Sequence, residues 1–267
     1  MTKRSFYLEH GHLICERLIP TFFLDELRFT IASALQSKIK NHSNKFTQNI
    51  SSDTEPLHIE KLLNEGMIEI YQSNPEYLQY AVDAACNSSA LNRLVSNYEI
   101  LEKVSDLVGC DRHKLGLIQA RLRVDLPSKF KKNMEKVHLG FHQEAGYFSQ
   151  NVSQSTGLVA WIPLHDCAKK LGALEVLDGS HKNGLIQHNI EYMDKEKQRH
   201  KRATLQNDST NRFKNIVMEC KKSDVAFQNF FLMHKSGINA YTKKVRYTVV
   251  VRYSDITARD WRPQSWS

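Results

Sequence analysis

The sequence has no long apolar run. None of its hydrophobic stretches reaches the ~18 residues that a membrane-spanning helix requires. The charged start of the chain, Met1 to Tyr7, is not followed by the apolar segment of a signal peptide, so we expect none. The five cysteines are scattered and contain no CxxC pair, which argues against a disulfide framework or a zinc knuckle. These absences predict reduced thiols and a cytoplasmic location.

Acidic residues are outnumbered by basic ones. The chain has 37 Lys and Arg against 29 Asp and Glu, so its net charge is +8. This excess makes anionic substrates or surfaces expected partners, although it says nothing about the fold. Glycine and proline are few, and 41% of the 267 residues are hydrophobic, which suffices for a sizeable core.

Helical periodicity dominates the first ~110 residues. A short strand over residues 12–19 precedes an amphipathic helix that begins near Thr21 and ends near Lys40. Residues 41–56 are polar and predict a surface loop. Further helices are expected over residues 57–71, after Pro75, and over residues 91–108. The helix after Pro75 carries Tyr77, Tyr80, Ala81 and Ala84 on one face.

From Lys114 the periodicity becomes that of strands. Helices followed by short strands predict an α+β fold in which the strands form two packed sheets or a small barrel. The charged segment 184–215 is too polar for the core and too long for a tight turn, so we interpret it as an insertion or a lid. Strands are expected over residues 115–124, 157–165, 171–177, 224–233 and 245–253. In the first of them, one face carries Gln119, Arg121 and Arg123, and the other carries Ile118, Ala120, Leu122 and Val124.

The stretch Phe141-His-Gln-Glu-Ala-Gly146 carries a histidine and a carboxylate two positions apart. In an extended segment His142 and Glu144 point to the same side. His234 ends an apolar run later in the chain and offers a second imidazole. Two histidines and one carboxylate form the facial arrangement that holds non-haem Fe(II) with positions left open. Arg246, on the following strand, offers a planar cation for the far carboxylate of a bound 2-oxo acid.

Four segments together resemble the phytanoyl-CoA dioxygenase family of Fe(II)/2-oxoglutarate oxygenases, which includes ectoine hydroxylase. The first is similar to the family's W/F-H-Q-D-x-x-Y motif and the third to its G-A-L-x-V-x-P-G-S-H motif. Their order and spacing carry the resemblance more than any single motif does. The segments are Phe141–Tyr147, Trp161–His165, Gly172–His181, and His234–Asn239 followed by Arg246 and Arg252-Tyr253.

The resemblance implies a double-stranded β-helix, a jelly-roll or cupin-like barrel, buttressed by N-terminal helices. It implies a single oxygenase domain over residues 1–267, with a mainly helical part to residue 110 and the jelly-roll core after it. It also implies Fe(II), 2-oxoglutarate and O2 as cofactor and cosubstrates, and release of succinate and CO2. It assigns His142, Glu144 and His234 to iron, Arg246, Ser236, Trp161 and Gln119 to the cosubstrate pocket, and Arg121, Gln143 and Tyr147 to the substrate.

Two positions depart from the family's pattern. Glu144 stands where the family usually has Asp, and a carboxylate there argues for hydroxylation, because related halogenases have Gly or Ala at this place. Asp178 replaces the usual Pro before Gly179 and is expected to change only a turn. The expected substrate is a small or carrier-linked, anionic metabolite, while hydroxylation, desaturation, cyclisation and epimerisation all stay open.

Two other functions compete with the enzyme. A basic nucleic-acid-binding module would need a docking motif or interleaved aromatic and basic residues, and neither is present. A non-catalytic jelly-roll binding protein would not need all three ligands and Arg246. An oxygenase therefore remains the leading hypothesis.

Overall fold

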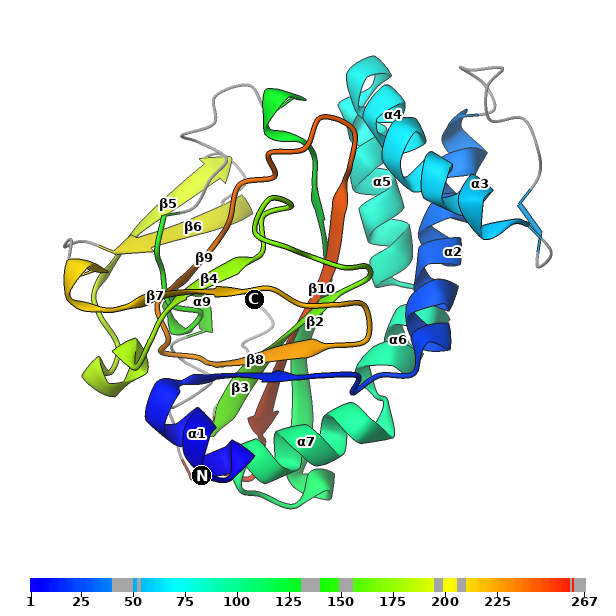
Figure 1. Ribbon diagram of the computed structural model, residues 1–267. Coiled ribbons are helices and arrows are strands. Elements are labelled where there is room, and N and C mark those ends of the chain that lie inside the picture. Colours follow the sequence, from blue (N-terminus) through cyan, green and yellow to red (C-terminus); the bar gives the residue numbers. More distant parts are fainter. Residues whose placement is uncertain are drawn as a thin grey trace.

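The computed structural model describes residues 1–39, 50–51, 54–130, 140–148, 156–194, 199–205, 210–259 and 261 (Figure 1). Most of the expected polar loop 41–56 lies outside these residues. The helices are α1 Lys3–His10, α2 Thr21–Ile39, α3 Pro56–Lys61, a π-helical turn Leu62–Gly66, α4 Met67–Ser73, α5 Pro75–Cys86, α6 Ser89–Val95, α7 Tyr98–Val108 and α9 Ala145–Phe148. The strands are β1 His12–Cys15, β2 Leu115–Asp125, β3 Gly157–Pro163, β4 Leu174–Leu177, β5 His188–Asp194, β6 Arg199–Leu205, β7 Asn215–Met218, β8 Val225–Asn229, β9 His234–Ser236 and β10 Arg246–Asp255.

The helical layer forms because each long helix has an apolar face. In α2 the residues Leu24, Leu27, Ile31 and Leu35 recur at helical spacing, and all four are fully buried. Helix α5 begins where the Asn74 side chain accepts a hydrogen bond from the backbone N–H of Glu76. None of the helices among the described residues combines the length and hydrophobicity that a membrane crossing needs.

Two details of the helical layer differ from the sequence-based expectation. Tyr80, expected on the inner face of α5, is 44% exposed, because the buried face of this helix is formed by Ala81, Val82 and Ala85. The helix expected over residues 57–71 is interrupted by the π-helical turn, which lies between α3 and α4. An extra residue per turn is accommodated there without ending the helix.

The strands form two antiparallel sheets that face each other. The larger sheet has the order β1-β8-β3-β10-β2, and the smaller one has the order β7-β4-β9. An apolar cluster between the two sheets joins Trp161 and Ala226 of the larger sheet to Leu174, Val176 and Leu232. This arrangement is the predicted double-stranded β-helix.

The helices cover the outer face of the larger sheet (Figure 1). Alternate residues of β10, namely Tyr247, Val249, Val251 and Tyr253, are buried in the cluster that the helices and the sheet share. The residues between them face the barrel interior, as period-two alternation requires. Strand β10 therefore presents one face to the helices and the other to the interior.

The strand expected over residues 224–233 is in fact β8 followed by a buried turn. The Asn229 side chain accepts a hydrogen bond from the Phe231 backbone N–H, and the Leu232 N–H donates to the Asn229 carbonyl. The turn is built from apolar residues because it lies inside the barrel, so its composition is that of a buried strand. The short β9 starts directly after it, at His234.

The described part of the charged segment 184–215 contains an antiparallel hairpin. Strands β5 and β6 pair along their length: His188 lies opposite Leu205 at one end, and Asp194 lies opposite Arg199 at the other. The hairpin lies on the side of the molecule opposite helices α2 to α6 (Figure 1). The chain then returns to the smaller sheet through β7.

Candidate active site

His142, Glu144 and His234 come together inside the barrel. One ligand atom from each lies within 4.8 Å of the others, and all three residues are buried. Their meeting is enforced by the backbone, because His142 and His234 form an isolated antiparallel bridge with reciprocal N–H to carbonyl bonds of 3.0 and 2.9 Å. Glu144 follows where the chain turns into the short helix α9.

Each imidazole is held by its Nδ1 atom. His142 Nδ1 donates to the Gly140 carbonyl at 3.0 Å, and His234 Nδ1 donates to the Leu232 carbonyl at 2.9 Å. A carbonyl can only accept, so these bonds place the proton on Nδ1 and leave the Nε2 lone pair free. Histidines that bind a metal through one ring nitrogen usually donate the N–H of the other nitrogen to such an acceptor.

Burial keeps both rings neutral. Burial, reinforced by His234, lowers the pKa of His142 to about 3. Burial also lowers the pKa of His234, although Glu144 opposes the change. Neutral imidazoles are the form that binds a metal ion.

Glu144 is held in its ionised form by Arg252. Burial raises the pKa of the Glu144 carboxyl, but Arg252, His234 and His142 together outweigh it, with Arg252 the largest of the three, and the pKa is lowered overall. Arg252 Nε and Nη2 both donate to Glu144 Oε1, at 3.0 and 2.8 Å. The other oxygen, Oε2, lies 3.7 Å from His234 Nε2, too far for a hydrogen bond. One carboxylate oxygen is thus taken up, and the other faces the histidines.

Arg246 lies in the interior and is 1% exposed. Its Nη2 atom forms an ion pair with Asp125 and donates to Ser236 Oγ at 3.3 Å. Its Nε and Nη1 atoms are buried and have no hydrogen-bond partner among the described residues. A buried guanidinium with unpaired N–H groups is costly. Arg246 is therefore suited to an anion that enters the barrel.

The remaining predicted pocket residues lie on the interior face of the larger sheet. Trp161 pairs with Val250 in the register of β3 and β10 and packs in the cluster between the sheets. Arg121 lies opposite Val250, and Gln119 lies opposite Arg252, so both share the interior face of β10. Arg121 is half-buried and Gln119 is exposed, because β2 is the edge strand of this sheet.

Two residues near His142 have different surroundings from each other. The Tyr147 ring contacts the His142 ring edge-on, with centroids 5.8 Å apart. Gln143 is fully buried, and its amide binds the Gly184 and Phe231 carbonyls and the Ile186 N–H at 2.6–2.8 Å. This side chain thus fastens backbone segments to one another, and its predicted contact with substrate stays a prediction.

Three polar residues at the site were not assigned from the sequence. Arg252 and Asp125 pair with Glu144 and Arg246 across 108 and 121 positions of the chain, so no local spacing relates them. Arg123 is near enough that its charge helps lower the pKa of His142, after burial and His234. The alternation of β2 placed Arg123 on the face of Gln119 and Arg121, and this was the only available signal.

One protein family, Phytanoyl-CoA dioxygenase (PhyH), matches residues 9–246. The chain belongs to the phytanoyl-CoA dioxygenase family. As a member, it is an Fe(II)/2-oxoglutarate-dependent oxygenase. The curated proteins give no match.

Solved structures share the fold of this phytanoyl-CoA dioxygenase family member. The non-heme alpha ketoglutarate dependent epimerase SnoN from nogalamycin biosynthesis has 15% identity and a TM-score of 0.58, over 99% of this chain and 86% of that one. The non-heme monooxygenase ThoJ has 16% identity and a TM-score of 0.60, over 96% and 78%. EvdO2 from Micromonospora carbonacea var. aurantiaca, complexed with 2-oxoglutarate, has 15% identity and a TM-score of 0.56, over 98% and 94%.

The residues of this family member fit the family's cofactors. Two neutral imidazoles and one ionised carboxylate converge with room between them, which is the donor set that suits Fe(II). The unpartnered N–H groups of Arg246, on Nε and Nη1, are buried donors available to a carboxylate such as that of 2-oxoglutarate.

Proposed function

We propose that this enzyme hydroxylates an unactivated C–H bond of a small or carrier-linked, anionic metabolite, with conversion of 2-oxoglutarate and O2 to succinate and CO2. The observation that carries the proposal is the buried convergence of His142, Glu144 and His234 in a barrel that also encloses Arg246. The carboxylate of Glu144 supports hydroxylation, because it fills the place that a halide would need.

His142, Glu144 and His234 hold the iron. When bound, Fe(II) supplies the activation of O2 that oxidation of an unactivated C–H bond needs. The backbone carbonyls of Gly140 and Leu232 fix the two rings, so both Nε2 atoms are available to the metal. Arg252 positions Glu144 by occupying one of its oxygens.

Arg246 binds the distal carboxylate of 2-oxoglutarate. Its Nη2 atom is held by Asp125 and Ser236, so the guanidinium plane is already oriented before the cosubstrate arrives. Trp161 and the apolar cluster between the sheets exclude water from this pocket. In so dry a pocket the pairing of carboxylate and guanidinium is stronger than in water.

The substrate approaches along the open edge strand β2. Every second residue of this strand faces the interior, and Gln119, Arg121 and Arg123 are three such residues. Two guanidinium groups in a row favour an anionic substrate, in keeping with the net charge of +8. Tyr147, beside His142, contributes an aromatic wall to the same space.

The enzyme works in a reducing compartment, for which the cytoplasm is our proposal. All five cysteines are free thiols, and Cys15, Cys167 and Cys220 are buried. Persistent free thiols are typical of a reducing environment.

An anaerobic titration tests the proposed centre. Addition of Fe(II) and then 2-oxoglutarate should produce a weak visible charge-transfer band in the wild-type protein and none in His142→Ala. Folded wild-type protein without a band would contradict the proposal and favour a non-catalytic barrel.

A succinate-release screen against anionic metabolites tests the reaction, with His142→Ala as the control. The mass of the product separates the outcomes: hydroxylation adds one oxygen atom, whereas desaturation or cyclisation removes two hydrogens and epimerisation leaves the mass unchanged. Succinate release with a product that gains no oxygen would contradict hydroxylation and retain the oxygenase centre.

A further inference from the structure

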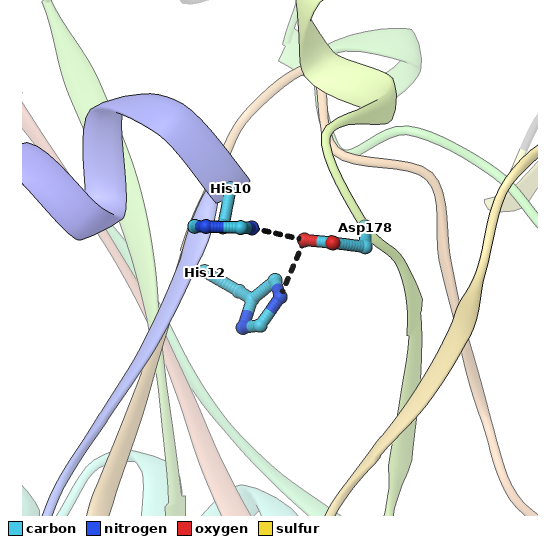
Figure 2. A group of neighbouring side chains, drawn as sticks. All are labelled: His10, His12 and Asp178. Carbon is cyan, nitrogen blue, oxygen red and sulfur yellow. Dashed lines mark hydrogen bonds and ion pairs between the residues drawn. The ribbon is translucent and has the colours of Figure 1, made fainter.

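A second group of two histidines and a carboxylate lies outside the iron triad. His10, His12 and Asp178 each offer a ligand atom within 4.8 Å of the others (Figure 2). Asp178 Oδ1 lies 2.8 Å from His10 Nδ1 and 3.1 Å from His12 Nε2. The side chains are 31%, 10% and 26% exposed for His10, His12 and Asp178, so an ion can reach them from solvent.

We propose that His10, His12 and Asp178 form a second metal site, for a divalent transition ion of the Zn²⁺ class. Imidazole nitrogens with one carboxylate oxygen suit Zn²⁺, whereas Mg²⁺ and Ca²⁺ prefer oxygen ligands alone. Three protein ligands leave one position of a tetrahedral ion for water. The site shares no residue with the iron triad.

The backbone brings the three ligands together independently of any ion. His10 ends α1 and His12 begins β1, and Gly11 between them has a left-handed conformation with φ of 76°. A Cβ at Gly11 would lie 2.4 Å from the His181 ring, so only glycine allows this close turn. The Gly179 N–H donates to the His10 carbonyl at 3.0 Å, which fixes the turn after β4 against the end of α1.

An ion here would brace the strand that positions His234. Asp178 directly follows β4, in which Val176 pairs with His234. The Leu177 N–H also donates to the Met233 carbonyl at 2.9 Å. A metal at the second site therefore joins the N-terminal segment to the strand beside the iron triad.

The competing interpretation is a metal-free latch, in which Asp178 accepts a hydrogen bond from each histidine. The two interpretations respond differently to Asp178→Asn. An amide oxygen still accepts hydrogen bonds and preserves a latch, but it lacks the negative charge that holds a divalent cation.

The test is equilibrium dialysis of tag-free protein with Zn²⁺. Wild-type protein should bind two equivalents, one at each site, and Asp178→Asn should bind one. In a His142→Ala/His234→Ala background, one equivalent should remain, and adding Asp178→Asn should weaken it at least about a hundredfold. Loss of a ligand costs more than loss of a residue that orients one, which is worth about 10- to 100-fold.

His10→Gln is a second variant on a different element and should have the same effect. His113→Gln is the matched control, because His113 is exposed in a short 3₁₀ turn and lies outside both groups. Circular dichroism verifies that each variant is folded. Equal Zn²⁺ binding with and without Asp178→Asn would overturn the site and leave the latch. Equal losses in His113→Gln and His10→Gln would also overturn it, because they would show non-specific binding.

Discussion

The iron triad and the His10–His12–Asp178 group each combine two histidines with one carboxylate, but they are held in different ways. In the iron triad, the atoms that do not face the centre are occupied by partners outside it: two backbone carbonyls and Arg252. The facing atoms, His234 Nε2 and Glu144 Oε2, are 3.7 Å apart. In the outer group, both histidines bond directly to Asp178.

This difference teaches how a protein prepares a metal site. External partners keep the ligands of the inner triad pointed at an open centre, so the side chains need to move little when an ion binds. The outer group must exchange its own hydrogen bonds for metal bonds. We therefore expect the inner triad to bind its ion more tightly, and the variants below test that contrast in order of effect.

His234→Ala should remove the inner site altogether. It deletes one of three ligands, and we expect Fe(II) affinity to fall by more than about a hundredfold and the charge-transfer band to disappear. An anaerobic Fe(II) titration with 2-oxoglutarate present is the measurement, with His113→Gln as the control. A band of normal intensity in His234→Ala would place the iron elsewhere.

Arg246→Ala should separate cosubstrate binding from iron binding. Loss of a buried, charge-assisted pair should weaken 2-oxoglutarate by about 100-fold, or about 2.8 kcal/mol. Iron affinity without cosubstrate should change far less. Titration of the band with 2-oxoglutarate measures the effect, and Arg246→Lys should recover part of it. The reverse pattern, with iron lost and cosubstrate retained, would move the carboxylate clamp to another residue.

Arg252→Gln tests whether external partners prepare the inner triad. Without the two N–H groups on Oε1, Glu144 is free to turn, and iron affinity should fall by about 10- to 100-fold. Competition with a chelator measures this without relying on turnover. Arg252→Lys should restore the charge but offers one nitrogen where Arg252 uses two, so an intermediate affinity is expected. If Arg252→Gln bound iron like the wild type, preparation by this arginine would be disproved.

Glu144→Asp should have a smaller effect. The shorter side chain still supplies a carboxylate but cannot reach both Arg252 and the centre from the same backbone position, so iron affinity should drop by about tenfold or less. Glu144→Ala should cost considerably more. Equal affinities in the two variants would count against Glu144 as a ligand.

Asp178→Ala should have the smallest effect when a chelator keeps the protein metal-free. It removes two hydrogen bonds at a partly exposed position, and we expect a loss of about 1 kcal/mol in the free energy of unfolding. The corresponding decrease in Tm is about 2 °C. Thermal unfolding followed by circular dichroism is the measurement. A decrease several times larger would show that the metal-free group contributes more to stability than these two hydrogen bonds explain.

Strands with two different faces were predicted well from the sequence. The expected strand 115–124 corresponds to Leu115–Asp125, and the expected strand 245–253 corresponds to Arg246–Asp255. Alternation fails only at Ile118, where a bulge opposite Arg252 and Tyr253 turns this side chain toward Phe230 and Phe231. A bulge inserts one residue without changing the composition, so periodicity does not reveal it.

Elements without a clear apolar period were missed. Helix α1 buries only Tyr7 among its residues, and the strands of the β5–β6 hairpin lie in a charged segment. The buried turn after β8 has the apolar composition of a buried strand, so composition alone predicts a strand there. In none of these segments does the sequence show the periodic apolar pattern that identifies the other elements.

The two histidine groups show the same limit. The spacing of His142 and Glu144 and the motif around His234 were visible in the sequence, and the structure brings these residues together. The ion-pair partners Arg252 and Asp125 were not assigned, and neither was the outer group, in which Asp178 lies 168 and 166 positions from His10 and His12. Asp178 was expected only to alter a turn, yet the turn brings it to two histidines.

The π-helical turn Leu62–Gly66 is fastened to the start of β10. The Leu63 carbonyl accepts the Tyr247 hydroxyl at 2.5 Å, and the Asn64 side chain accepts the Val245 N–H at 2.8 Å. The same strand carries Arg246 at one end and Arg252 near the other. A displacement of this irregular turn would consequently act on the strand that carries both the cosubstrate anchor and the support of the iron carboxylate. Evolution or design could therefore retune catalysis from the helical layer, without altering any group that touches a reactant.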